Sequence, residues 1–239
     1  MMVPIHNILS RAKYRLLSRA PQKLYWYLMG EVKAVPAVTS EYATVEDCLE
    51  SGRQVVAVLE KLGVVRADGV TLQIGSGLGR VEAHLCHRVS RCYGLDVSPS
   101  MVRKARALVR EPNVEFVCGD GKGLGGWNDS SFDLIYSFLV FQHLPRPLVQ
   151  KYIDESARKL KPSGALVFQV PVDETGSEPE PPASHPYGLR YYTRAQIRQM
   201  LHGADFGEIN LFDMAGDPDE GVQRADIVFR ALRRGCAAV

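Results

Sequence analysis

Glycines recur at every second position where a short apolar run ends, at residues 75, 77 and 79 of the segment Leu72–Arg80. Glycine permits tight turns and lets backbone N–H groups approach a ligand closely. The helical pattern Val81–Val89 follows, and a helix N-terminus favours an anionic group. A dinucleotide fingerprint would need Gly or Ala at position 80, where this chain has Arg80. The spacing therefore suits a nucleoside ligand that lacks a pyrophosphate.

Two carboxylates end the next two predicted strands. Asp96 closes the run Arg91–Leu95, about twenty residues after the glycines, where a carboxylate can accept hydrogen bonds from both hydroxyls of a ribose. Asp120, followed by Gly121, ends the strand Val114–Cys118, where it could accept from the amino group of an adenine. The structural alternatives are a helix cap for Asp96 and a turn residue beside glycine for Asp120.

A fourth element, the strongly apolar run Phe132–Phe138, delivers Ser137 through His143 to the same edge. Open α/β sheets bind their ligands outside the carboxyl ends of the strands, so we expect these residues to face the same ligand. His143 is the best candidate for a general base there. The alternative is a structural histidine at the start of a helix.

These residues can meet only if a parallel sheet brings them to one edge. Strand and helix patterns alternate from Val70 onward, which predicts a doubly wound parallel sheet. The last two strands, at about 207–214 and 225–232, have no helix between them and should pair antiparallel. The other expected strands are Val70–Ile74, Arg91–Leu95, Val114–Cys118, Phe132–Phe138 and Ala165–Pro171. The expected helices are 45–62, Val81–Val89, Ser98–Val109 with Ser98 as N-cap, Leu148–Leu160 and Thr193–His202.

In this order the four elements resemble the class I S-adenosylmethionine-dependent methyltransferases, over roughly residues 45–235. The segment Tyr191–Thr193 and the helix after it look like small-molecule members of that family. The resemblance implies a Rossmann-like α/β fold with a mostly parallel seven-stranded sheet that ends in an antiparallel hairpin. It implies S-adenosyl-L-methionine as the cofactor and a small molecule as the methyl acceptor.

The resemblance also assigns cofactor contacts residue by residue. The methionine part would lie along Gly75, Ser76, Gly77 and Gly79. Asp96 would hold the ribose, and Asp120 with Gly121 would bind the adenine. Val97 and Met101 would pack on the adenine, Ser137 and Phe138 would border the methionine and sulfonium, and Arg53 would reach the carboxylate or lie on a solvated helix face. The family usually has an acid where this chain has Gln73, which offers a carbonyl oxygen without charge. We expect cofactor binding to survive this change but to be weaker.

The acceptor pocket is expected in or after an acidic, proline-rich stretch at 172–187. Such a stretch predicts an exposed loop, and a long loop in a compact domain is often a lid, here 172–192. The candidate lining residues are His185, Tyr187, Arg190, Tyr191 and Tyr192.

Methyl transfer depends mainly on positioning, but a hydroxyl acceptor also needs a base, for which His143 is the candidate. We therefore expect O-methylation of a sugar, lipid or secondary metabolite. One alternative is an N-methyltransferase of a small amine or a protein terminus, which needs no strong base. Another is a catalytically silent cofactor-binding partner subunit. An NAD-dependent oxidoreductase is the competitor at the level of the fold, and Arg80 and the final hairpin argue against it.

Composition limits the function classes less than the motifs do. The chain has 239 residues, 46% hydrophobic and 23% charged, which suits one globular α/β domain with a small appendage. The net charge of +2 is too small to imply nucleic acid, and no apolar run is long enough for a transmembrane helix.

Residues 1–30 carry five basic and no acidic side chains. An amphipathic basic helix and the aromatic cluster Leu24–Met29 predict a cap over the domain. A membrane-surface or lipid-substrate contact and a transit segment are the alternatives. We divide the chain into an extension, 1–44, and a methyltransferase domain, 45–239, so the basic segment should lie outside the cofactor site. The oligomeric state stays open.

Five cysteines are scattered without a CxxC pair, which argues against a disulfide framework and a zinc site, and no other metal-ligand cluster stands out. We expect buried thiols in a reduced, cytoplasmic compartment, with Cys118 in the core.

Overall fold

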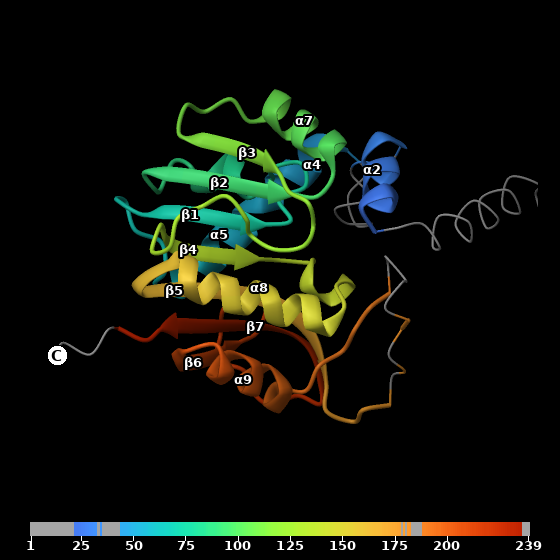
Figure 1. Ribbon diagram of the computed structural model, residues 1–239, viewed down its shortest axis with the longest axis vertical. Coiled ribbons are helices and arrows are strands. Elements are labelled where there is room, and N and C mark those ends of the chain that lie inside the picture. The colour runs from blue at the N-terminus through green and yellow to red at the C-terminus, as the bar shows by residue number, and fades with distance from the viewer. Residues whose placement is uncertain are drawn as a thin grey trace, which may run out of the picture.

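The computed structural model describes residues 22–32, 34, 44–177, 179, 181–182 and 188–235. Seven strands form one sheet in the order β3-β2-β1-β4-β5-β7-β6 (Figure 1). The first five strands in the chain run parallel, and β7 pairs antiparallel with both β5 and β6. The predicted doubly wound sheet with a C-terminal antiparallel hairpin is thereby confirmed.

The strands are β1 (Val70–Ile74), β2 (Arg91–Asp96), β3 (Val114–Cys118), β4 (Phe132–Ser137), β5 (Leu160–Asp173), β6 (Phe206–Phe212) and β7 (Arg224–Arg233). The helices are α2 (Gln22–Val32), α4 (Val45–Glu50), α5 (Gly52–Lys61), α6 (Glu82–Leu85), α7 (Pro99–Leu108), α8 (Arg146–Lys159) and α9 (Arg194–Gly203), with the 3-10 turn η1 (Phe141–His143).

Two hydrophobic layers hold the sheet between its helices. On one face, Val55, Val56 and Leu59 of α5 pack with Val81 and Leu85 against the strands. On the other face, side chains of α8 and α9 pack on the sheet, among them Val149, Ile153, Ile197 and Leu201. Burial of these apolar faces supplies the main driving force for this arrangement.

Several element boundaries differ from the sequence expectation. The predicted helix 45–62 is divided at Ser51, whose side chain donates to the Cys48 carbonyl oxygen at 2.6 Å. The predicted helix 81–89 shrinks to α6, and β5 extends in both directions beyond 165–171. The predicted caps are confirmed, because the Ser98 and Thr193 side chains accept from the backbone N–H groups of Met101 and Gln196.

The cysteines are divided between core and surface. Cys48, Cys86 and Cys92 are buried free thiols, as expected. Cys118 was expected in the core and is exposed, because β3 is the edge strand of the sheet. Within the described part of the chain, no helix is both long and apolar enough to cross a membrane, and no group of three metal-ligating side chains gathers.

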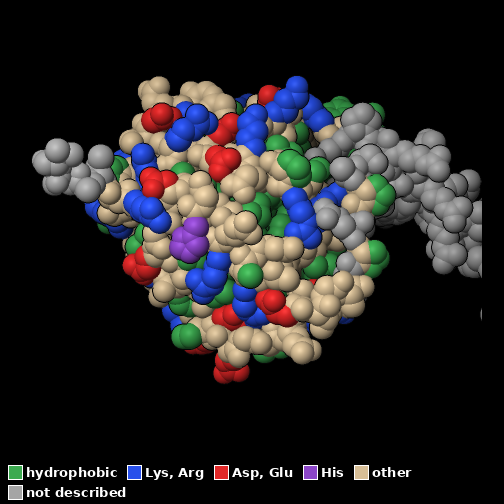
Figure 2. Space-filling model, turned by 60° about the horizontal axis from the view of Figure 1, so that its bottom comes forward, with side chains coloured by type: hydrophobic (Ala, Val, Ile, Leu, Met, Phe, Trp, Pro, Cys, Tyr) green, Lys and Arg blue, Asp and Glu red, His purple; other side chains and the backbone are tan. Residues whose placement is uncertain are grey.

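Charges of both signs are mixed on the face that carries the β6 and α9 side of the molecule. Figure 2 shows basic and acidic side chains interspersed there, with hydrophobic side chains scattered between them. Charged side chains of β6 and β7 also form ion pairs, for example Glu208 with Arg230 at 2.6 Å. This face has no uniform basic surface of the kind that binds a phosphate backbone.

Candidate cofactor site

The glycine loop after β1 bends because its glycines take left-handed backbone conformations, with φ of 76° at Gly75, 56° at Gly77 and 79° at Gly79. A Cβ at position 75 would lie 2.3 Å from a methyl carbon of Val140, so Gly75 lets the loop after β4 come close. A Cβ at position 79 would lie 2.6 Å from the ring of Phe116. The first glycine therefore shapes the site, whereas the third lets the start of α6 approach the core.

Asp96 ties this loop to the end of β2. One carboxylate oxygen accepts the N–H of Gly77 at 2.9 Å, and the other accepts the N–H of Ser98 at 2.8 Å. Burial raises the pKa of Asp96 above its ordinary value, and the backbone N–H groups of Ser98, Gly77 and Val97 oppose that rise. Asp96 thus does help to start α7, as the structural alternative held, and it also faces the pocket.

One pocket collects most of the predicted cofactor residues at the carboxyl ends of β1, β2 and β4. Within it, the Ser76 hydroxyl is buried and has no hydrogen-bond partner among the described residues, so it can meet a polar ligand group. This orphaned hydroxyl, the glycine cradle and the Asp96 carboxylate fit a polar nucleoside-type cofactor. The predicted residues that line the pocket are Gln73, Gly75, Ser76, Gly77, Asp96, Val97, Met101, Gly121, Phe138 and His143.

Four predicted cofactor residues lie elsewhere. Arg53 is exposed and pairs with Glu50 at 2.5 Å, on the solvated helix face that was its alternative. The Ser137 hydroxyl is buried in the sheet and donates to the Ile74 carbonyl oxygen at 3.1 Å. Asp120 is exposed and accepts the N–H of Lys122, and Gly79 packs on Phe116. None of the four is among the pocket-lining residues.

The predicted acceptor residues anchor the chain instead of lining this pocket. Arg190 is only 1% exposed and donates to the carbonyl oxygens of His143 and Pro182 at 3.0 and 2.9 Å. Tyr192 is equally buried, and the Arg146 guanidinium lies over its ring at 4.6 Å. Arg146 also donates to the Tyr191 carbonyl oxygen. Polar residue types next to a loop do not reveal such burial. His185 and Tyr187 lie outside the described residues.

Helix α2 contributes a residue that the sequence argument placed outside the site. Trp26 lines the pocket, and its ring centroid lies 5.9 Å from that of His143. The hydroxyls of Ser98 and Ser100 donate to the carbonyl oxygens of Trp26 and Tyr27 at 3.1 and 3.0 Å, which joins α2 to α7. Figure 1 shows α2 beside the ends of the central strands. The aromatic cluster was the available signal, but its distance along the chain from the motifs hid the contact.

Leu139 and Val140, in the run Ser137 through His143 that the sequence places at this edge, also line the pocket. The pocket residues that were not proposed as site residues are Ile74, Arg80, Leu95, Ser98, Gly119, Leu144 and Tyr152. Leu139 has a φ of 62°, which is rare for a residue with a Cβ and turns the chain sharply after β4.

Gln73 stands in front of a buried acid. With its amide nitrogen toward Glu82, it donates to both carboxylate oxygens at 2.9 Å. Glu82 is fully buried, and this burial raises its pKa to about 8, while the nearby charge of Arg80 opposes the rise. The acid that the resemblance expects at position 73 is absent there. The pocket meets the neutral amide of Gln73, and Glu82 of α6 lies behind it without lining the pocket.

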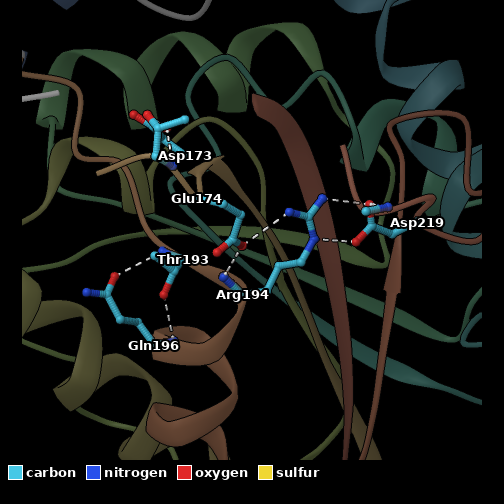
Figure 3. A network of polar contacts seen from close by, with 8 residues as sticks. Asp173, Glu174, Thr193, Arg194, Gln196 and Asp219 are labelled. Carbon is cyan, nitrogen blue, oxygen red and sulfur yellow. Dashed lines mark hydrogen bonds and ion pairs between the residues drawn. The ribbon is translucent and has the colours of Figure 1, made fainter. Parts of the chain in front are cut away.

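An ion-pair network fixes both ends of the segment between β5 and α9 (Figure 3). The Arg194 guanidinium pairs with Asp219 at 2.5 Å and with Glu174 at 3.2 Å. Nearby, the Arg224 guanidinium and the Thr175 hydroxyl hold the pKa of Asp173 well below its usual range. The chain therefore leaves β5 and enters α9 at fixed points, whatever path it takes between them.

Comparisons with known proteins agree with this geometry. Residues 72–168 match a family model described as a methyltransferase domain. Phosphoethanolamine N-methyltransferase 1 of Triticum aestivum is 24% identical over 156 residues, which cover 64% of this chain and 30% of the relative. Other matched relatives are named as malonyl-acyl carrier protein and protein-L-isoaspartate O-methyltransferases. The matches span between 30% and 42% of the length of these curated relatives.

Two solved structures share the fold at low sequence identity. The cyclase SpnF superposes with a TM-score of 0.67 at 18% identity and covers 91% of this chain and 96% of its own. An S-adenosylmethionine-dependent methyltransferase of Clostridium acetobutylicum gives 0.60 at 16% identity and covers 77% and 91%. Because SpnF is a cyclase by name, likeness at this level concerns the fold and leaves the reaction open.

Proposed function

We propose that this chain is a class I S-adenosylmethionine-dependent methyltransferase, which transfers a methyl group from S-adenosylmethionine to a small-molecule acceptor. The match of residues 72–168 to a methyltransferase-domain model supports this proposal. The observation that carries this proposal is the joining of the glycine loop to Asp96 through the Gly77 N–H, inside a pocket at the strand ends. A dinucleotide site would also need room for a pyrophosphate at the start of α6, where Arg80 stands.

Each side of the pocket has a partner for one part of the cofactor. Asp96 would hold the ribose hydroxyls, and Val97, Met101 and Gly121 would enclose the adenine. The Ser76 hydroxyl and the N–H groups of the glycine loop would meet the methionine part. The bound cofactor supplies a methyl group on a sulfonium, which is already activated for transfer. The protein then contributes positioning and the exclusion of water.

The acceptor must approach from the side of Phe138, Leu139 and His143, the pocket residues that follow β4. From the sequence we expect a hydroxyl acceptor with His143 as its general base. In the structure the Gln142 amide nitrogen lies 3.3 Å from Nε2 of His143, where a base would need its lone pair. This contact favours an acceptor that is nucleophilic without a strong base, such as an amine or a carboxylate. Methylation of such an acceptor is therefore the second candidate function.

We also propose that residues 1–44 form an extension whose α2 helix covers the cofactor, with 172–192 as the acceptor loop. Exposed Leu24 and Tyr27 on α2 would support a contact with a lipid surface or lipid substrate. The buried free thiols support a cytoplasmic location.

Methyl transfer from labelled S-adenosylmethionine, screened over hydroxyl, amine and carboxylate acceptors, tests the proposal. Wild type should label at least one class, and Asp96→Asn should lose cofactor binding by calorimetry while it stays folded. A protein that binds S-adenosylhomocysteine but labels no acceptor would instead be a silent partner subunit. Preferential stabilisation by NAD in a thermal shift assay would exclude the proposed cofactor.

A further inference from the structure

A chain of side-chain hydrogen bonds runs from β7 through β5 to the ring of His143. Gln169 of β5 is fully buried, and its amide nitrogen donates to Asp226 at 2.6 Å and to the Gln142 amide oxygen at 3.1 Å. The Gln142 amide nitrogen in turn lies 3.3 Å from Nε2 of His143. These hydrogen bonds therefore connect the surface carboxylate of Asp226 with the imidazole of His143, which lines the pocket.

The two ends of Gln169 fix the direction of every bond in this chain. The backbone N–H of Leu139 can only donate, and it lies 2.9 Å from the Gln169 side-chain oxygen. The carboxylate of Asp226 can only accept when ionised, so it takes the Gln169 nitrogen. Gln169 must then donate to the oxygen of Gln142, which leaves the Gln142 nitrogen to donate to His143.

Nε2 of His143 consequently has to be an acceptor. A neutral imidazole has one protonated nitrogen and one acceptor nitrogen, so the proton is on Nδ1. We infer that Gln142, Gln169 and Asp226 form a relay that fixes neutral His143 as its Nδ1-protonated tautomer. In the proposed methyl transfer, on which this last step rests, the Gln142 amide occupies the lone pair of Nε2, so His143 is not the general base for the acceptor.

The alternative base role has a structural cost. If Nε2 took a proton, its N–H would face the N–H of the Gln142 amide, so two donors would meet. The only escape would be a rotation of the Gln142 amide. Rotation would place the Gln142 nitrogen against the Gln169 nitrogen, and Gln169 cannot rotate in response without facing its oxygen to Asp226. A buried donor without an acceptor costs about 1–3 kcal/mol, so the relay opposes both changes.

Nitrogen-detected NMR of the full-length, 15N-labelled protein reports this tautomer directly, and it needs neither cofactor nor acceptor. The His143→Gln variant, which lacks the ring, assigns the signals of His143. Above the titration range of the ring, wild type should show a protonated Nδ1 and an unprotonated Nε2. The opposite pattern, or an even mixture, overturns the relay, and this result requires no folded relay variant.

Gln142→Glu is the sharpest variant, because its carboxylate still accepts from Gln169 but can no longer donate to His143. The proton should move to Nε2, whereas Gln142→Leu should give a mixture of tautomers. Gln150→Leu, which removes an amide that bonds to Asp154 on the same helix, should keep the wild-type tautomer. An unchanged tautomer in Gln142→Glu contradicts the inference.

Turnover of labelled cofactor tests whether His143 is the base, separately from the proposed function itself. If His143 is not the base, His143→Gln should change kcat by the same factor at every pH, because no limb of the pH profile belongs to the imidazole. The loss of one limb of the pH profile in His143→Gln would mean that His143 acts as a base and would overturn this step. A wild-type protein with the expected tautomer and no methyl transfer to any acceptor would refute the proposed function and leave the relay intact.

Discussion

Replacement of Glu82 by Gln tests whether a buried, protonated carboxyl lies beneath the glycine loop. Glu82 is fully buried, and its pKa is raised from 4.5 to about 8 in the folded protein. The folded state therefore binds its proton more tightly than the unfolded chain does. Stability from this group is full below its unfolded pKa and is lost as the pH rises through the folded pKa.

The size of the effect follows from these two pKa values. Between about pH 5.5 and about pH 8.5, Glu82 is protonated mainly in the folded state, and this difference between the two states nearly vanishes at the upper end. The free energy of unfolding therefore falls by about 3 kcal/mol over this range. Glu82→Gln keeps the shape of the side chain but removes the titration. The stability of the variant relative to wild type should therefore rise by about 3 kcal/mol over the same pH range.

Urea unfolding of both proteins at the two pH values measures this difference. Glu220→Gln, which removes an exposed acid, is the matched control and should follow wild type. If the difference between Glu82→Gln and wild type is the same at both pH values, Glu82 does not change protonation on unfolding and is not a buried, protonated carboxyl in the folded state.

Three further predictions concern the walls of the pocket. Gln73→Glu places a second acid against the protonated Glu82, so the pair must take up a further proton or hold a buried charge, and the free energy of unfolding in urea should fall by about 2 kcal/mol. The double variant Gln73→Glu/Glu82→Gln should restore it, and a stable single variant would contradict the Gln73–Glu82 contact. Gly75→Ala should lower the free energy of unfolding by about 2 kcal/mol and weaken S-adenosylhomocysteine binding in calorimetry. Adding Val140→Ala should recover the part of this loss that is due to the steric contact, but not the part that is due to the positive φ. Gly30→Ala puts a Cβ 2.3 Å from the Ser100 hydroxyl and should displace α2, which would weaken cofactor binding about tenfold. Trp26→Ala should weaken binding by a similar factor, because Trp26 lines the pocket. Unchanged affinity in both variants would show that α2 does not cover the cofactor.

Much of the fold could be predicted because its determinants are local. The alternation of apolar strands with helical patterns, the glycines at 75 and 77, and the caps at Ser98 and Thr193 each act within a few residues. Carboxyl ends of neighbouring parallel strands meet at one edge, so the sequence alone places Asp96, Phe138 and His143 together, and all three line the pocket. Boundaries were less predictable, since Ser51 ends α4 through a contact that pattern alone does not show.

The tertiary structure decided what depends on contacts between distant parts of the chain. Trp26 reaches the pocket because Ser98 and Ser100, at the start of α7, bind the carbonyl oxygens of α2, more than seventy residues away. Arg190 and Tyr192 have the residue types of an acceptor site, yet burial makes them anchors. The hydrogen-bond role of His143 depends on Gln169 and Asp226, which only the pairing of β5 with β7 brings together. Sequence spacing determines which side chains reach an edge, and the partners across the sheet determine what those side chains can do there.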